Sequence, residues 1–497
     1  MLVMMIGAVA LGADREQWGE RFTRNQVSGE KDLPESIDPA TRKGIRWSIP
    51  LGSETYATPT VAGGRIFVGT NNRQPRDPRH KGDRGILYCL DEKTGQFIWQ
   101  LVVPKLSTEK NDVYLDWPNA GLCSPPTIEG DRVYAVTNRG EVACLDINGM
   151  ANGNDGPFVD EATHQTPKGQ ELVPIGPTDA DIIWLTDLVE QAGIYNHDAS
   201  HCSPLIDGDF IYVNTSNGVD NTHRKIRRPD APSLVVLDKK TGRIVAKDVE
   251  GIGPRIFHCT WSSPALGVVN GKKLIFFGGG DGVVYAFEAL NAMPPQGTVL
   301  SLKLVWQFNC DTSYPVEKKL EVHAGHSNRR ETPSNIKSMP VFFDGRVYVT
   351  AGGDIWWGKN QAWLKCIDAS RSGDVTSSAE VWSYEMKRTC STPAIYDGMV
   401  FVADCGGRTI HCVDLATGKG LWTHPAKGDM WSSPLVADGR VYIGTRRCEF
   451  FILAASREKK VLCATELDAP ISATAVAANG VLYMATDSTL YAIAKPQ

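Results

Sequence analysis

Histidine is the residue type in this chain best suited to hold a transition metal, and five of the ten histidines gather in three short segments. The segments are HDASH over residues 197–201, FHCTW over residues 257–261, and HAGH over residues 323–326. Imidazole nitrogens bind zinc, copper and iron, and Asp198 adds a carboxylate. No spacing matches a known metal motif, and imidazoles in aromatic-rich loops often only form hydrogen bonds. The candidate metal ligands are His197, His201, His258, His323 and His326.

Two basic loops stand out in a chain whose formal net charge is -5. They are RQPRDPRHKGDR over residues 73–84 and THRKIRRPD over residues 222–230. Arginine presents paired donors to carboxylate and phosphate groups, so these loops could recognise an anionic small molecule or a protein partner. The alternative is a pair of solvated loops whose charges pair with nearby aspartates. The candidate contacts are Arg76, Arg79, Arg224, Arg227 and Arg228.

Repeated hairpins must position these loops. Eight segments resemble HCSPLIDGDFIYVNT (residues 201–215) and WSSPLVADGRVYIGT (residues 431–445), with an apolar run, a turn and an alternating run. This pattern predicts an antiparallel hairpin. A third strand ends in an acidic turn such as LDEKTG (residues 90–95), and a fourth strand carries an aromatic residue. Four strands in about 40 residues are typical of a propeller blade.

The eighth repeat ends at residue 497 without a fourth strand of its own. Residues 44–50 supply a matching strand, with Trp47 where other fourth strands have a tryptophan. Pairing the two ends of the chain would remove the exposed edges. We therefore predict an all-β fold: a single eight-bladed β-propeller of four-stranded antiparallel blades over residues 44–497, its ring closed by an N-terminal strand. Seven blades plus an unpaired hairpin are the alternative.

The S-P pair opening the first strand, G-x-V-Y-V-G across the hairpin and L-D-x-x-T-G-x-x-x-W across the last two strands resemble the pyrroloquinoline-quinone (PQQ) repeat family. That family includes quinoprotein alcohol dehydrogenases and non-enzymatic relatives such as an outer-membrane assembly scaffold, so the resemblance supports the fold more than a reaction. It implies that the fourth-strand tryptophans dock on neighbouring blades. These are Trp47, Trp99, Trp184, Trp306, Trp382 and Trp422; Val245–Ala246 and Leu462–Cys463 replace them in two blades.

For a dehydrogenase the resemblance implies PQQ with a calcium ion in the axial funnel. No two cysteines here are adjacent, unlike the cysteine pair that lies over the quinone in those enzymes, and there is no C-x-x-C-H segment for haem. Oxygen ligands for calcium would have to come from polar residues at turns after the second strands. The candidates are Asn217, Asp281, Asp354 and Asp404, and no catalytic residue is assigned.

The residue before each S-P pair should lie at the mouth of the funnel. This ring is Tyr56, Leu122, His201, Trp261, Lys337, Cys390, Trp431 and Ile471. Its aromatic rings, with His201 and Lys337, could stack on and pair with a flat anionic ligand, or bulky side chains could simply plug the channel. The candidate cofactor-binding residues are Tyr56, His201, Trp261, Lys337 and Trp431. Most long insertions fall in loops on the same face, where binding function concentrates.

Composition narrows the function classes further. A pI near 6.1 gives no sign of the generally basic surface that nucleic-acid-binding proteins have. Residues 1–13 are apolar, too short to span a bilayer and similar to the core of a signal peptide, so we expect a periplasmic or otherwise exported protein with an N-terminal extension at residues 14–43. Four of twelve cysteines occupy one repeat position, which predicts buried thiols rather than disulfides.

Three functions remain open from the sequence. The leading hypothesis is a scaffold that binds a ligand or protein through its loop-decorated face. The second is a PQQ- and calcium-dependent dehydrogenase of alcohols or sugars, and the third is a metal-binding or redox protein that uses the histidine-rich loops.

Overall fold

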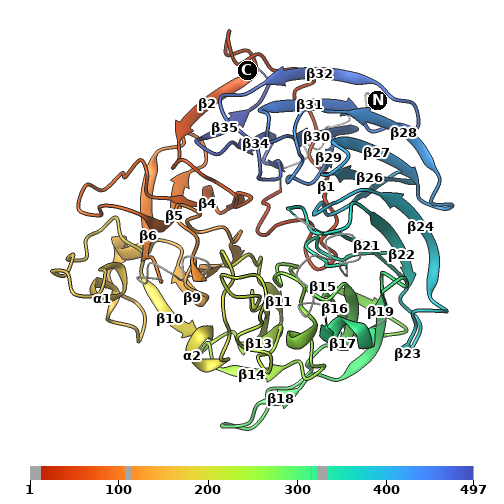
Figure 1. The fold of residues 1–497 in the computed structure, drawn as a ribbon. Coiled ribbons are helices and arrows are strands. Elements are labelled where there is room, and N and C mark those ends of the chain that lie inside the picture. The colour runs from red at the N-terminus through yellow and green to blue at the C-terminus, as the bar shows by residue number, and fades with distance from the viewer. Residues whose placement is uncertain (1–12, 107–114, 315, 322–333, 357, 496–497) are drawn as a thin grey trace, which may run out of the picture.

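The computed structural model describes residues 13–106, 115–314, 316–321, 334–356 and 358–495. Eight separate sheets stand around one axis like the blades of a propeller, as Figure 1 shows. The first to fourth strands of each repeat are called A, B, C and D, and within each blade they run in that order from the axis outward. A D–A loop therefore joins one blade to the next. The eight-bladed prediction is confirmed, and the seven-bladed alternative is wrong.

The first four blades follow one another along the chain. Blade 1 contains β3 (Thr60–Ala62), β4 (Arg65–Asn71), β5 (Arg84–Asp91) and β6 (Phe97–Pro104). Blade 2 contains β7 (Thr127–Glu129), β8 (Arg132–Val136), β9 (Glu141–Asp146) and β10 (Ile182–Asp187). Blade 3 contains β11 (Leu205–Asp207), β12 (Phe210–Asn214), β13 (Leu234–Asp238), β14 (Ile244–Lys247) and an added strand β18 (Leu300–Ser301). Blade 4 contains β15 (Ala265–Val269), β16 (Lys272–Gly278), β17 (Val283–Glu288), β19 (Leu304–Asn309) and an added β23 (Gly373–Asp374).

The other four blades complete the ring. Blade 5 contains β20 (Val341–Phe343), β21 (Arg346–Gly352), β22 (Ala362–Asp368) and β24 (Glu380–Met386). Blade 6 contains β25 (Ala394–Tyr396), β26 (Met399–Asp404), β27 (Thr409–Asp414) and β28 (Gly420–Pro425). Blade 7 contains β29 (Leu435–Ala437), β30 (Arg440–Gly444), β31 (Glu449–Ala454), β32 (Val461–Glu466) and the N-terminal β1 (Val27–Ser28). Blade 8 contains β33 (Val476–Ala478), β34 (Val481–Ala485), β35 (Thr489–Ile493) and β2 (Ile45–Pro50).

Blade 8 closes the ring with the two ends of the chain. Strand β2 pairs antiparallel with β35, with Trp47 opposite Ala492. The strand before the first repeat thereby supplies what the last repeat lacks, and the outer edge of β35 is paired rather than exposed. This confirms the closure predicted from the sequence.

Tryptophan and glycine lock neighbouring blades together. The Trp99 indole donates a hydrogen bond to the Ile147 carbonyl of the next blade over 2.9 Å, and Trp382 donates to Leu415 over 3.0 Å. Gly242 closes the acidic turn of blade 3 with φ +73°, and a Cβ added there would lie 2.4 Å from Trp184 Cε3. Glycine is therefore required at this turn for two reasons: the backbone is left-handed, and a side chain would collide with the indole.

The two blades without this tryptophan are packed by other segments. Beside Val245 and Ala246, β18 and the residue after it supply Leu300 and Leu302 to the same apolar cluster. Beside Leu462 and Cys463, the N-terminal extension supplies Ile37. The replacement of tryptophan thus coincides with extra chain that fills the junction.

The N-terminal segment of residues 14–28 follows the inside of the ring and contacts all eight blades in turn. It forms main-chain hydrogen bonds with innermost strands, including Arg15 with Val61, Phe22 with Leu266 and Gln26 with Val436. Figure 1 shows this segment, in red, passing through the middle of the ring. The segment covers the A–B turn side of the channel.

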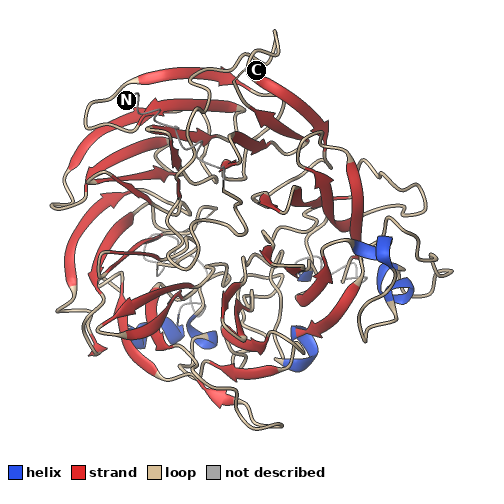
Figure 2. Ribbon diagram, turned by 180° about the vertical axis from the view of Figure 1, so that it is seen from behind, coloured by secondary structure: helices blue, strands red, loops and turns tan. Residues whose placement is uncertain are grey.

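Few helices accompany the strands, as Figure 2 shows from behind. In the described part of the chain they are the α-helices α1 (Glu161–Gln165) and α2 (Leu188–Gln191) and the 3-10 helices η2 (Gly149–Asn152), η3 (Gly253–Arg255) and η4 (Val316–Glu321). Among the residues that the structure describes, no helix is both long and apolar enough to cross a bilayer. All twelve cysteines are free thiols, and nine of them are buried, which confirms the prediction drawn from their place in the repeat.

Candidate functional site

A cavity of about 440 Å³ lies at the axis of the propeller. Its walls come from the B–C and D–A loops, and Trp18 of the N-terminal segment completes them. Six of the eight residues predicted for the funnel mouth line it, and at the other two positions the next residue does. The described lining residues are Trp18, Tyr56, Thr58, Trp117, Ala120, Cys123, Asp198, Ala199, His201, His223, His258, Trp261, Lys337, Ile355, Trp356, Cys390, Trp431 and Ser472.

Aromatic rings form much of the cavity wall. Trp356 stands nearly perpendicular to Trp261 on one side (centroids 5.9 Å apart, 81°) and to Trp431 on the other (5.5 Å, 78°). Tyr56 stacks on Trp431 at 6.0 Å and 29°. Trp356 is 45% exposed, unusual for so large an apolar side chain held among other rings. The rings thus enclose a box with accessible aromatic surface.

Lys337, Asp354 and His258 form a buried charged group at the cavity wall. The Lys337 ammonium contacts Asp354 Oδ2, while His258 Nδ1 lies 3.0 Å from the same oxygen and 3.2 Å from the ammonium. Burial opposes ionisation of Asp354, but Lys337 and His258 outweigh it and hold the pKa of that carboxyl well below its usual range. Burial likewise opposes the Lys337 charge, but Asp354 raises the pKa of the ammonium. Lys337 is therefore neutralised by the protein and is not left for an anionic ligand.

Two other titratable groups near the cavity are shifted by burial. Burial lowers the pKa of His201 to about 4, so this imidazole is neutral at pH 7. Burial also raises the pKa of Asp198 to about 7, against the opposing effect of Lys337. His201 packs edge-on against Trp18 at 5.6 Å, away from the other described histidines of the cavity.

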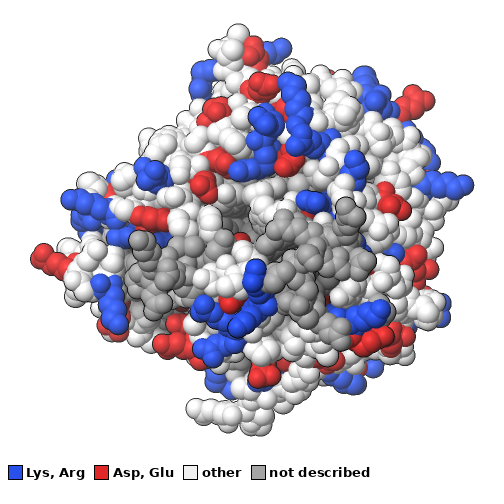
Figure 3. Space-filling view, in the orientation of Figure 1, with Lys and Arg blue, Asp and Glu red and all other residues white. Residues whose placement is uncertain are grey.

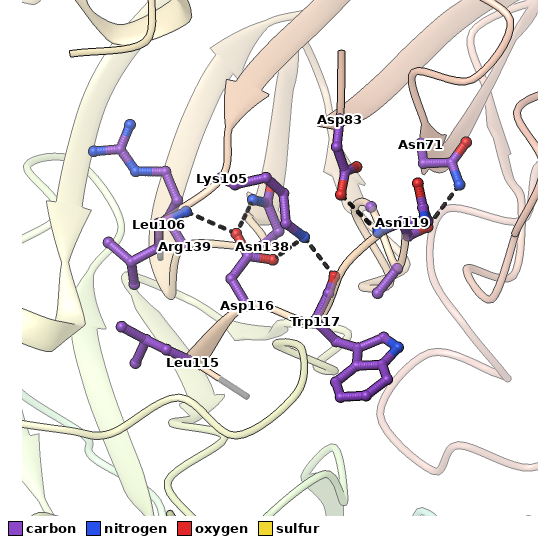
Figure 4. A network of polar contacts seen from close by, with 12 residues as sticks. Asn71, Asp83, Lys105, Leu106, Leu115, Asp116, Trp117, Asn119, Asn138 and Arg139 are labelled. Atoms are coloured by element: carbon purple, nitrogen blue, oxygen red, sulfur yellow. Dashed lines mark hydrogen bonds and ion pairs between the residues drawn. The ribbon is translucent and has the colours of Figure 1, made fainter. Parts of the chain in front are cut away.

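A polar network places the loop that carries Trp117 (Figure 4). Buried Asp116 accepts hydrogen bonds from the Leu106 amide over 2.9 Å and Asn138 Nδ2 over 2.7 Å, and it pairs with Lys105. Lys105 also donates to the Trp117 carbonyl over 2.6 Å. Burial is the main reason that the pKa of Asp116 is raised, although Lys105 opposes it. The network fixes the start of this loop, and Trp117 is held beside the cavity.

The two basic loops differ in how far their arginines are held by other protein groups. Arg76 donates to the Pro50 carbonyl over 2.7 Å and stacks on Tyr88, and Arg79 pairs with Asp77 and Asp179. In the second loop the side chains of Arg224, Arg227 and Arg228 are exposed, with Arg227 over the Tyr195 ring at 4.9 Å. Figure 3 shows lysines and arginines, in blue, around the hollow at the centre of this face.

The structure brings some predicted site residues together and separates others. His197 and His258 lie side by side, with Nε2 atoms 2.8 Å apart. His201 lines another part of the cavity, and His323 and His326 fall outside the described residues. Sequence reasoning missed His223, Trp356 and Trp18 as wall residues. The first two lie in B–C loops, which the S-P signature does not mark, and no repeat signal covers the segment that carries Trp18.

Comparison with known proteins identifies the repeat type. Residues 79–154 and 360–469 match the family model described as outer membrane protein assembly factor BamB. The resemblance to PQQ-repeat propellers is confirmed. No curated protein sequence matches the chain.

Two solved structures share the fold. The crystal structure of BamB from Moraxella catarrhalis aligns over 90% of this chain and 97% of that chain, with 13% identity and a TM-score of 0.53. A europium-containing methanol dehydrogenase aligns over 96% of this chain and 98% of that chain, with 12% identity and a TM-score of 0.60. At these identities the likeness shows the fold alone.

The described cavity residues do not fit PQQ with calcium. Calcium takes six to eight oxygen ligands, whereas Asp198 offers the only carboxylate among the described lining residues. The oxygen donors expected at the turns are engaged elsewhere: Asp281 pairs with Arg255 and Asp404 accepts from backbone amides. Asn217 likewise bonds to the Tyr195 amide. The donor set at this wall is richer in nitrogen than in oxygen.

Proposed function

We propose that this protein is a binding propeller that takes a flat, conjugated and uncharged small molecule into its axial funnel. The observation that carries this proposal is the box of rings formed by Tyr56, Trp261, Trp356 and Trp431 around a cavity of about 440 Å³. Ligand pockets of this kind are concave and mainly apolar, with a few polar groups that fix orientation.

The charges around the box favour an uncharged ligand. Lys337 is paired with Asp354, and Arg446, which lies over the Trp431 ring at 4.6 Å, is paired with Asp487 over 2.9 Å. An anionic ligand would therefore have to compete with carboxylates for both cations. A neutral ring system gains from stacking without that competition.

The test compares two flat quinones by isothermal titration calorimetry on the full chain. Menadione is the neutral probe, and PQQ, which carries three carboxylates, is the anionic probe, each titrated with and without calcium. We expect saturable, calcium-independent binding of menadione in the micromolar range, and weaker binding of PQQ. One ring–ring contact contributes about 0.5–1.5 kcal/mol, so Trp431→Ala should weaken menadione binding by about 2- to 10-fold.

Trp363→Ala is the matched control, because Trp363 lies on β22 and does not belong to the cavity wall. This variant should bind menadione as the unmodified chain does. The proposal fails if neither quinone binds, or if both tryptophan variants lose affinity equally. Binding of PQQ that requires calcium, with dye reduction in the presence of an alcohol, would instead establish the dehydrogenase alternative.

Protein docking on the same face is a second candidate function. It is favoured by the match to the BamB family model and by the three exposed arginines of the loop at residues 222–230. A fluorescent polyglutamate peptide is the probe, followed by anisotropy at low salt. Exchange of Arg224, Arg227 and Arg228 for glutamate should abolish binding of this acidic peptide, and unchanged binding would exclude the loop as an acidic-partner site.

Export completes the proposal. The apolar residues 1–13 support it, because their composition is that of a signal-peptide core. Expression with and without residues 1–13, followed by cell fractionation, tests it. The longer chain should reach the periplasm, and equal retention of both chains in the cytoplasm would refute export by this segment.

A further inference from the structure

We propose that His197, His223 and His258 bind one divalent transition-metal ion in the wall of the funnel, with Asp198 beside them as an oxygen ligand. The three histidines come from three different loops of the same face. His197 lies in the chain between β10 and β11, His223 between β12 and β13, and His258 between β14 and β15. The fold of blade 3 and its two neighbours therefore decides whether they meet.

The donor atoms of the three histidines converge. One ligand nitrogen from each lies within 4.8 Å of the other two. The ring centroids are 4.6 Å apart for His197 and His258, 5.0 Å for His197 and His223, and 5.5 Å for His223 and His258. His197 and His258 are buried, and His223 is half-buried at the edge of the cavity.

The hydrogen bonds of the outer ring nitrogens aim the inner ones at a common point. His197 Nδ1 lies 2.6 Å from the Val219 carbonyl, and a carbonyl oxygen can only accept, so Nδ1 carries the proton and Nε2 presents a lone pair. His258 Nδ1 lies 3.0 Å from Asp354 Oδ2, and donation to that carboxylate also leaves Nε2 with a lone pair. In these tautomers two lone pairs face each other at 2.8 Å and repel, which a metal ion or a proton between them would relieve.

This arrangement is the one that metal-ligating histidines ordinarily have. Such a histidine donates its other ring N–H to a carboxylate or a backbone carbonyl, which fixes the tautomer and the ring orientation. Asp354 has that role for His258, and Val219 has it for His197. Zinc–nitrogen bonds of about 2.0–2.1 Å place two tetrahedral ligands about 3.3 Å apart, so binding requires the two rings to separate by about half an ångström.

The donor set selects the class of metal. The cluster itself offers three nitrogens. Asp198 Oδ2 lies beside two of them, 3.5 Å from His197 Nε2 and 4.0 Å from His258 Nε2, and is the nearby oxygen donor. Imidazole suits zinc, copper, iron and nickel, whereas calcium and magnesium require oxygen. We commit to an ion of the zinc class.

A second cluster of histidine and aspartate shows how a neighbouring arginine can take the place of a metal ion. Asp77, His80 and Asp179 also gather within 4.8 Å of one another. The Arg79 guanidinium already contacts both carboxylates, at 2.5 Å and 3.3 Å, and supplies the positive charge that an ion would bring. The three-histidine cluster has no arginine or lysine in that bridging position among the described residues.

The ion would face the cavity. Asp198, His223 and His258 all line it, so a coordination position not taken by the protein would point toward a molecule held in the aromatic box. The inference goes beyond the binding function proposed above, and it does not depend on it, because the metal alone is the ligand in the test.

A metal-free arrangement of the same atoms is the competing description. Lys337 Nζ lies 3.2 Å from His258 Nδ1 and could donate to it, and His258 Nε2–H would then donate to His197 Nε2. That description assigns no metal-binding role to His223. The effect of His223 on metal affinity therefore separates the two descriptions.

The experiment uses the full chain, stripped with a chelator and then supplied with Zn²⁺ or Co²⁺. Metal analysis after dialysis gives the stoichiometry, calorimetry gives the affinity, and the visible absorption of bound Co²⁺ reports the coordination number. We expect about one equivalent of Zn²⁺, no competition from Ca²⁺, and a four- or five-coordinate Co²⁺ spectrum. Loss of one ligand in His223→Gln should weaken Zn²⁺ binding at least tenfold, since loss of a supporting group alone costs about 10- to 100-fold.

His424→Gln is the matched control, because His424 is a half-buried histidine on β28 that contacts Phe451 outside the cavity. Circular dichroism confirms that each variant is folded, and His258→Gln is the second ligand variant. The inference is overturned if the supplied chain retains less than about a tenth of an equivalent of Zn²⁺. It is also overturned if His223→Gln binds Zn²⁺ as tightly as His424→Gln does.

Discussion

Substitution of Arg24 should release the N-terminal segment from the propeller more directly than that of any other residue in the segment. Its side chain is 0% exposed. The guanidinium donates to the Pro264 carbonyl over 2.9 Å, the Trp18 carbonyl over 3.0 Å, and Ser203 Oγ and O over 3.2 Å and 2.7 Å. Burial lowers the pKa of Arg24 to about 10, so the side chain is still charged at pH 7.

The contacts set the expected cost of Arg24→Met. A hydrogen bond from a charged group contributes about 1.5–3 kcal/mol, so four contribute about 6–12 kcal/mol. Burying the charge costs several kcal/mol, which the substitution recovers. The net loss should be about 3–5 kcal/mol in the free energy of unfolding, because the methionine leaves the acceptors buried without their donor.

Urea denaturation measures the global loss, and limited chymotrypsin digestion measures release of the segment. Trp18 and Phe22 become cleavable when the segment leaves the channel, and neither site is altered by the substitution. Because Trp18 is part of the cavity wall, digestion should also lower the affinity for menadione.

Arg21→Met is the control within the same segment. Arg21 has a half-exposed side chain and pairs with Glu129 at the surface over 3.0 Å, so its removal should cost at most about 1 kcal/mol. Unfolding free energies within about 0.5 kcal/mol of each other for the two variants, with equal protease resistance, would refute the assignment of Arg24 as the anchor.

Three further outcomes are expected. In urea denaturation, Gly242→Ala should destabilise the chain by at least about 1 kcal/mol more than Gly208→Ala. Both glycines have positive φ, but only Gly242 contacts an indole ring. Equal losses would contradict the role of Gly242 in docking Trp184 between blades. Burial lowers the pKa of His201 to about 4 from an ordinary value of 6.5. The stability that depends on its neutral form is therefore fully present above pH 6.5 and falls by up to about 3 kcal/mol as the pH drops toward 4. His201→Gln should flatten this pH dependence, and an unchanged slope would show that other groups cause it. Burial raises the pKa of Cys390 to about 12, and nine other thiols are buried. A thiol reagent should therefore modify at most two cysteines in the folded chain and all twelve after unfolding. Modification of fewer than twelve after unfolding would reveal disulfides.

The sequence repeat made it possible to predict much of this architecture. Turn glycines, acidic turns and fourth-strand tryptophans recur at a fixed period, and each reports a local requirement of one blade, as Gly242 against Trp184 illustrates. The funnel mouth could be predicted for the same reason. A residue before an S-P pair has a fixed place in its blade, and eight-fold repetition brings those places to one axis.

The sequence alone could not decide which side chains meet across loops. His223 stands 26 residues from His197 and 35 from His258, in a loop with no repeat signal, and only the ring of blades brings the three imidazoles together. Lys337 could be predicted at the funnel but not its pairing with Asp354, because that contact depends on the path of a B–C loop. The course of residues 14–28 through the channel was likewise decided by tertiary structure. Local patterns determine strands and turns, whereas contacts between irregular loops depend on packing that no short pattern encodes.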